Sequence, residues 1–281
     1  MDTLSEHAAF GGTVGFYRHW SDVNNCHMQF SVFVPPQAGD APVPVLTYLA
    51  GLTCTEETFM IKGGAQRIAA ELGLMLVAPD TSPRGDNVPD DPDGAYDFGL
   101  GAGFYLNASA APWNRHYHMY DYVTIELQDC LFAAFPGDRE RQGVFGHSMG
   151  GHGALTIGLR NPQLYKSISA FAPICSPVRC PWGQKALGNY LGGEQSAWAE
   201  YDATELVKRI ETLPAGEILI DQGMADQFLQ QELHPHLLQS ACRDKGVALK
   251  LRQHEHYDHG YYFIATFMED HLRHHAALLL P

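Results

Sequence analysis

The fold is decided by the stretch Gly143-Val144-Phe145-Gly146-His147-Ser148-Met149-Gly150 and the small-residue run 151–160 that follows it. The first three residues predict the end of a short buried strand, and residues 151–160 predict a helix. The G-x-S-x-G pentapeptide between them places Ser148 on a sharp turn from strand to helix, which is the context of a nucleophile elbow. The alternative is a glycine-rich turn in which Ser148 only caps a helix.

Strands and helices alternate on both sides of this motif, which implies a mostly parallel sheet covered by helices on both faces. Functional residues are then expected at the carboxyl ends of the strands. No repeat or linker interrupts the pattern, so we predict one α/β-hydrolase domain over residues 1–281. The long Gly-, Asp- and Asn-rich segment 83–113 is typical of an excursion over a site. We expect strands over 13–17, 28–34, 43–50, 74–79, 167–172, 217–221 and 248–252, and helices over 58–72, 120–135, 184–191, 203–210, 227–242 and 263–279.

Composition excludes several classes of partner. The formal net charge of −14 argues against nucleic acid, which needs a basic binding face. We expect no signal peptide, because the first residues have no basic start and no apolar run, and no stretch approaches the ~18 apolar residues that a membrane helix needs. Six scattered cysteines without C-x-x-C pairs indicate free thiols in a reducing compartment, so we expect a cytoplasmic protein.

A serine nucleophile needs a base, and the base needs a carboxylate that orients it. In α/β-hydrolases the acid and then the histidine follow the serine along the chain. Asp221 ends an apolar strand and Asp226 lies in the loop beyond it, where a carboxylate is free to turn back toward a histidine. We therefore choose Asp226, whose alternative role is to cap the next helix. Asp258 is disfavoured because it adjoins the candidate histidine.

The candidate base is His259, in a loop after the last predicted strand and before the final helix. Its alternative is a solvated loop histidine. His254 and His256 share one face of a strand end and leave a zinc site as an alternative, but no third ligand completes the pattern, so we expect no metal. Three further histidines lie on the terminal helix, and we expect them at the surface: His271, His274 and His275.

An oxyanion hole in this fold takes one N–H from the residue after the nucleophile and another from the loop after the third strand. Met149 follows Ser148, and the loop is Ala50-Gly51-Leu52-Thr53-Cys54-Thr55. Because Gly51 permits close approach of the backbone, we choose the Leu52 N–H as the second donor. The alternative is an ordinary tight turn.

Taken together, these segments resemble the S-formylglutathione hydrolases, the esterase D family of α/β-hydrolases. The resemblance spans nearly the whole chain in the family's order, although Ala225 and Gly260 replace an acidic residue and a serine that relatives often carry. The matching segments are 51–55, 78–85, 101–105, 112–113, 119–123, 146–153, 181–183, 221–223, 226–229 and 257–259.

The resemblance implies hydrolysis of the small-molecule thioester S-formylglutathione to glutathione and formate, a step of formaldehyde detoxification, without a cofactor. By position it implies the same triad and oxyanion donors, a thiol-reagent-sensitive Cys54, and Trp182 near the substrate. Since glutathione carries carboxylates, a basic group should face the cleft, and the candidates are Lys62, Arg84 and Lys185. A general short-chain carboxylesterase, an acyltransferase, a non-catalytic binding protein and a homodimeric assembly are left open.

Overall fold

Nine strands form one sheet in the computed structural model, which describes residues 1–212, 214 and 216–280. Their order across the sheet is β1-β2-β3-β5-β4-β6-β7-β8-β9. The ribbon β1–β3 is antiparallel and joins β5 in antiparallel fashion, and every later pairing is parallel. The strands are β1 (Asp2–Ala9), β2 (Gly12–Ser21), β3 (Cys26–Val34), β4 (Val43–Leu49), β5 (Met75–Pro79), β6 (Gly137–His147), β7 (Ser167–Phe171), β8 (Ile218–Gly223) and β9 (Leu249–His254).

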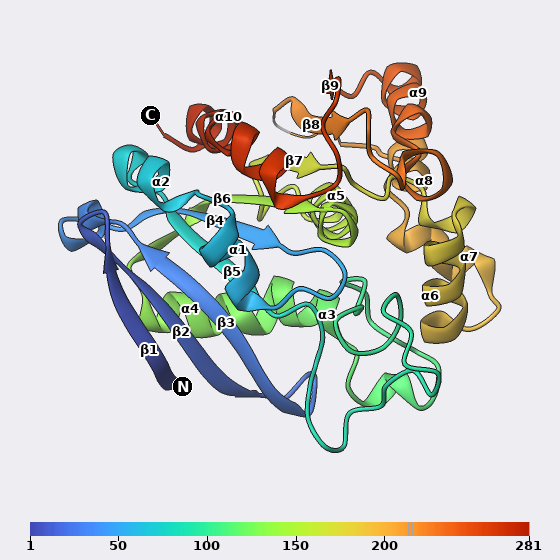
Figure 1. The fold of residues 1–281 in the computed structure, drawn as a ribbon, viewed down its shortest axis with the longest axis horizontal. Coiled ribbons are helices and arrows are strands. Elements are labelled where there is room, and N and C mark those ends of the chain that lie inside the picture. Colours follow the sequence, from blue (N-terminus) through green and yellow to red (C-terminus); the bar gives the residue numbers. More distant parts are fainter. Residues whose placement is uncertain (213, 215, 281) are drawn as a thin grey trace.

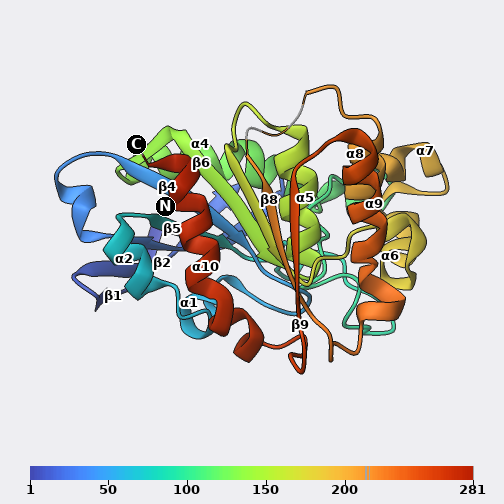
Figure 2. The ribbon, with the colours of Figure 1, turned by 90° about the horizontal axis from the view of Figure 1, so that it is seen from above.

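Helices cover both faces of this sheet. In Figure 1, α2 and α10 lie on one side of the strands and α4 on the other, and Figure 2 shows α10 crossing over the parallel strands. The α-helices are α1 (Glu56–Lys62), α2 (Gln66–Leu72), α3 (Met119–Asp121), α4 (Leu127–Ala134), α5 (Met149–Arg160), α6 (Pro181–Leu191), α7 (Gln195–Trp198), α8 (Ala203–Lys208), α9 (Pro235–Lys245) and α10 (Tyr261–Leu279). Shorter 3₁₀ segments span Pro36–Gly39, Trp113–Arg115, Pro177–Arg179 and Ala199–Tyr201, and π segments span Tyr122–Glu126 and Leu229–Leu233.

The central strands are buried on both faces, as a doubly covered parallel sheet requires. All residues of β4, β5, β7 and β8 are buried. This explains why 43–50 and 74–79 are almost continuously apolar rather than alternating. The α/β-hydrolase fold is thereby confirmed, and the carboxyl ends of β4, β5, β6, β8 and β9 meet at one edge of the sheet.

Three details of the predicted elements are wrong. Strand β1 was missed because it is a mostly exposed edge strand without an apolar pattern. The helix expected over 58–72 is two helices, since α1 ends at Lys62 and is followed by Gly63 and by Gly64, which has a positive φ of 66°. The helix expected over 227–242 is a π segment and α9, separated by a left-handed His234 just before Pro235.

Among the described residues no helix is both long and apolar enough to span a membrane. All six cysteines are free thiols, as expected from their spacing.

Candidate active site

Ser148 occupies the turn between β6 and α5 in a conformation that L-residues rarely adopt, with φ 58° and ψ −118°. The neighbouring glycines are required sterically, because a Cβ at Gly146 would overlap the Gly150 carbonyl and one at Gly150 would overlap the Leu49 carbonyl. The Ser148 N–H donates to the Phe171 carbonyl at 3.0 Å, which ties the turn to the end of β7. Such strain, held in place by packing, is typical of a nucleophile elbow.

Asp226 and His259 are in direct contact. His259 Nδ1 lies 2.5 Å from Asp226 Oδ2, and Asp226 Oδ1 accepts a 2.8 Å hydrogen bond from the Phe228 N–H. Asp226 is only 6% exposed. The contact occupies Nδ1 and fixes the ring, so Nε2 is the nitrogen left to exchange a proton with a substrate or nucleophile.

Ser148 and His259 line one cavity of about 160 Å³. This is smaller than the several hundred Å³ of most ligand pockets, and it suits a substrate whose group beside the serine is small. Tyr96 was not anticipated because its segment carries no recognisable site motif, and its ring meets Trp182 edge-on at 6.3 Å. The cavity is lined by Gly51, Leu52, Thr53, Cys54, Tyr96, His147, Ser148, Trp182, Phe228 and His259.

His147 is a second histidine of the cavity that sequence reasoning did not single out. Its ring lies 4.4 Å from that of His259, and neither ring nitrogen has a hydrogen-bond partner among the described residues. Burial, and then the neighbouring His259, lower the pKa of His147 well below its ordinary value. His147 is therefore neutral, and its ring packs against the His259 ring. Phe228 contacts the same His259 ring edge-on, with the ring centres 4.9 Å apart.

The turn after β4 lies directly against the elbow. A Cβ at Gly51 would sit 3.3 Å from the Ser148 Cβ, so glycine allows this close approach. The Cys54 N–H closes the turn on the Gly51 carbonyl at 3.3 Å, and Thr53 has a left-handed φ of 67°. Leu52 and Cys54 line the cavity from this turn, and Met149 begins α5 at the elbow. The sequence analysis places this turn after the third strand, and it follows the fourth strand of the structure because β1 was not among the expected strands.

The three candidate basic residues differ. Arg84 Nε lies 2.7 Å from Asp80 Oδ2. Lys185 Nζ lies 2.6 Å from Asp97 Oδ1 and 3.4 Å from Asp91 Oδ2, both on the long loop, and Lys185 does not line the cavity.

Lys62 has no ion pair with a carboxylate of the described residues. Its Nζ lies 6.0 Å from the centre of the Tyr261 ring. Burial raises the pKa of the Cys54 thiol, and the charge of Lys62 acts in the opposite direction. Lys62, like Lys185, does not line the cavity, but no carboxylate of the described residues neutralises its charge, and that charge acts on the cavity residue Cys54.

The expectation that the terminal-helix histidines lie at the surface is wrong for His271 and His275, which are fully buried, while His274 is half-buried. They share the apolar face of α10, which packs on the sheet. Ser169 contacts one nitrogen of each buried ring, through 2.8 Å hydrogen bonds to His271 Nδ1 and His275 Nε2. The i, i+4 spacing of these histidines in step with Ile264 and Met268 was the available signal.

The remaining candidates lie apart from His259. Asp221 is fully buried and pairs with Arg252 through hydrogen bonds of 2.6 and 2.5 Å. His254 Nε2 lies 3.3 Å from Asp221, whereas His256 is exposed. Within the described part of the chain, no three His, Cys, Asp or Glu side chains are grouped as a metal site would need.

A strained serine at a strand–helix elbow, beside a buried aspartate–histidine pair on this sheet, defines a serine hydrolase of the α/β-hydrolase fold. The comparisons agree. A family model described as "Putative esterase" matches residues 21–274, and the chain belongs to the esterase family and, within it, to the S-formylglutathione hydrolases. It is 52% identical to the S-formylglutathione hydrolase of Rattus norvegicus over 280 residues, which cover 99% of each chain.

Two further relatives support this assignment. The Mus musculus S-formylglutathione hydrolase is 51% identical over the same share of each chain. The solved structure of the S-formylglutathione hydrolase from Agrobacterium tumefaciens is 50% identical, with a TM-score of 0.97 over 99% of this chain and 100% of that one.

Proposed function

We propose that this hydrolase cleaves S-formylglutathione to glutathione and formate, with Ser148 as nucleophile, His259 as general base and Asp226 as its orienting carboxylate. The observation that carries this proposal is the 2.5 Å contact between His259 Nδ1 and Asp226 beside a cavity that Ser148 shares. The relatives' names supply the substrate, and the small cavity suits the formyl group.

The first half of the reaction forms a formyl-serine. Ser148 Oγ attacks the formyl carbon while His259 Nε2 takes the hydroxyl proton. The N–H groups of Met149 and Leu52 are the proposed donors to the oxyanion, each worth roughly 3 kcal/mol in comparable sites. The C–S bond then breaks, and the glutathione sulfur leaves with the proton from His259. Because a thiol has a pKa of about 8.5, its departure needs less acid assistance than that of an alcohol.

The second half returns the enzyme to its starting state. A water molecule loses a proton to His259 Nε2 and attacks the formyl-serine carbonyl, and the same N–H groups stabilise the oxyanion. The ester C–O bond breaks, formate leaves, and Ser148 Oγ regains a proton from His259. Every step uses a side chain or backbone amide of this chain, so the proposal includes no cofactor or metal.

The rest of the cavity suggests how the substrate is held. Cys54 and Trp182 both line the cavity, and we propose that they contact the acyl group or the glutathione sulfur. Lys62 is the proposed partner of a glutathione carboxylate. Lys185 is a weaker choice, because Asp91 and Asp97 already neutralise it.

The cellular setting is also a proposal. Six free thiols support action in a reducing compartment, which we take to be the cytoplasm, in formaldehyde detoxification. One domain over 1–281 and a homodimer stay predictions, which limited proteolysis and light scattering at several concentrations would measure.

The decisive experiment compares kcat/KM for S-formylglutathione with that for 4-nitrophenyl acetate. A clear preference for the formyl thioester is expected. A strong preference for the aryl ester would instead make this a general carboxylesterase. Lys62→Gln should raise KM for S-formylglutathione and leave KM for the neutral ester unchanged, and Lys185→Gln, whose lysine is already paired, is the matched control.

A further inference from the structure

The turn that carries the Leu52 N–H has a strained backbone, and residues from other segments of the chain form hydrogen bonds to it. Thr53 holds a φ of 67°, and the closing hydrogen bond from the Cys54 N–H to the Gly51 carbonyl is long at 3.3 Å. A left-handed non-glycine residue costs of order 1 kcal/mol or more, so it persists only where neighbours fix it.

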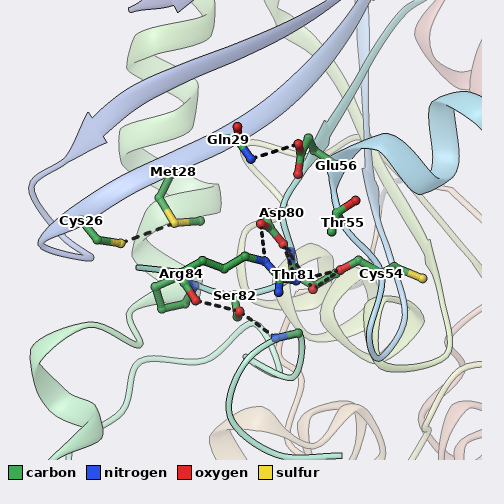
Figure 3. A network of polar contacts seen from close by, with 12 residues as sticks. Cys26, Met28, Gln29, Cys54, Thr55, Glu56, Asp80, Thr81, Ser82 and Arg84 are labelled. Atoms are coloured by element: carbon green, nitrogen blue, oxygen red, sulfur yellow. Dashed lines mark hydrogen bonds and ion pairs between the residues drawn. The ribbon is translucent and has the colours of Figure 1, made fainter. Parts of the chain in front are cut away.

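The Cys54 carbonyl, at the end of this turn, accepts hydrogen bonds from two side chains that follow β5. Thr81 Oγ1 donates to it at 2.5 Å, and Arg84 Nη2 donates to it at 3.3 Å. Figure 3 shows both side chains converging on Cys54 from the segment after β5. The Thr53 N–H is held as well, by the Gly101 carbonyl at 2.9 Å.

Asp80 sets the direction of both donors. Its side chain accepts hydrogen bonds from Arg84 Nε at 2.7 Å, from Arg84 Nη2 at 3.1 Å and from the Thr81 N–H at 2.6 Å (Figure 3). Asp80 is 3% exposed, so water does not compete for these contacts. A planar guanidinium held at both Nε and Nη2 by one carboxylate has little freedom, and its Nη2 also donates to the Cys54 carbonyl.

We propose that Thr81 and Arg84, oriented by Asp80, are positioning residues. They hold the turn 51–54, here called the oxyanion turn, through the Cys54 carbonyl. The inference rests on the proposed function, since it assumes that the Leu52 N–H stabilises the oxyanion. Charge on the substrate oxygen develops only in the transition state, so a displaced donor lowers kcat much more than it changes substrate binding.

The test removes the Thr81 hydroxyl while keeping the side chain's shape. Thr81→Val should lower kcat about ten- to a hundredfold, because losing an oxyanion donor outright costs about 10²–10³, and should change KM less than about twofold. Thr81→Ser, which restores the hydroxyl, should return kcat to within about threefold of wild type. That rescue separates the hydroxyl from the effect of packing.

Ser31→Ala is the matched control. The Ser31 hydroxyl is buried and donates at 2.7 Å to the Glu56 carbonyl, two residues after Cys54 and outside the turn. Both variants lose a buried hydroxyl-to-carbonyl hydrogen bond, so both should lower Tm, but Ser31→Ala should keep kcat within about twofold of wild type.

Thr81→Val with wild-type kcat, or Ser31→Ala with an equal loss of kcat, would overturn the inference. If Thr81→Val does not fold, Arg84→Gln serves instead, with a smaller expected loss of kcat and unchanged KM. Wild-type kcat in Arg84→Gln would also overturn the inference.

All variants are assayed with S-formylglutathione and 4-nitrophenyl acetate, and kcat should fall by the same factor for both. A wild-type protein active only on the aryl ester would refute the proposed substrate while leaving this test intact.

Discussion

Among the described residues, two clusters combine serine, histidine and aspartate, and they differ in their access to the cavity beside Ser148. The cavity cluster consists of Ser148, His259 and Asp226. The interior cluster lies between α10 and the sheet, and its polar groups form a chain. It consists of Asp221, His271, Ser169, His275 and Ser167, joined to Arg252 at its Asp221 end.

The hydrogen bonds of the interior cluster are as good as those of the cavity cluster. Ser169 joins His271 Nδ1 and His275 Nε2 at 2.8 Å each, and His275 Nδ1 lies 2.6 Å from Ser167 Oγ. Ser169, however, belongs to the regular strand β7 and is fully buried. Its hydroxyl has two imidazole partners and no access to a ligand.

The difference between the clusters is one of backbone and position, not of residue types. Ser148 stands past the carboxyl end of β6 with φ 58°, which turns its side chain out of the sheet and into the cavity. His259 likewise lies in a loop beyond β9. Serine, histidine and aspartate within a strand or under a helix satisfy one another, whereas the same residues beyond strand ends face a ligand.

The largest expected effect separates the two serines. Ser148→Ala should lower kcat by roughly 10⁴-fold or more, as for other serine nucleophiles, because no other group forms the acyl intermediate. Ser169→Ala should leave kcat within about threefold and lower Tm instead. Steady-state kinetics and thermal unfolding of both variants measure this, and a loss under tenfold for Ser148→Ala would remove it from the mechanism.

The two aspartates should separate next. Asp226→Asn should lower kcat by about 10³–10⁴-fold, since an amide no longer holds the required tautomer of His259. Asp221→Asn should change kcat only a few fold but lower the free energy of unfolding by roughly 2–3 kcal/mol. It weakens the buried pair with Arg252, which then keeps only its exposed partner Asp270. Urea unfolding and kcat on the same samples test the pair; the reverse ranking in kcat would assign the roles the other way.

Each member of the cavity cluster carries a local signal in the sequence. Ser148 has its glycines and flanking elements, and chain order then limits where the acid and the base lie. Asp226 was preferred to Asp221 because it stands in a loop, and the contact with His259 agrees with that geometry. The roles themselves await the variants above.

Other parts of the molecule depend on contacts between distant segments, which one sequence does not reveal. His271 and His275 look like surface residues until Ser167 and Ser169 are placed opposite them across the α10–β7 packing. The hydrogen bond from Thr81 to the Cys54 carbonyl joins the loops after β5 and β4, and the two residues are 27 positions apart in the sequence. No periodicity or motif reports such a crossing.

The interior cluster should also make stability depend on pH. Burial lowers the pKa of His271, and burial followed by the neighbouring histidines lowers that of His275 well below its ordinary value. Below about pH 6.5 the unfolded chain therefore binds protons that the native state excludes, and the free energy of unfolding falls as the pH falls. His275→Gln should flatten this dependence between pH 7 and 5, measured by urea unfolding. An unchanged slope would mean that His275 is protonated inside the fold.

The smallest expected effect comes from Glu56, near the cavity cluster, and has the opposite sign. Burial, and then the charge of Asp80, raise the pKa of Glu56 to about 7, and its Oε2 has no hydrogen-bond partner among the described residues. The native state then keeps a proton that the unfolded chain loses above about pH 4.5, so this group lowers the free energy of unfolding as the pH rises toward 7. Glu56→Gln removes that loss, and the variant should gain stability relative to wild type between pH 5 and 8. A difference between the two proteins that does not change with pH would show that Glu56 is ionised in the fold throughout this range.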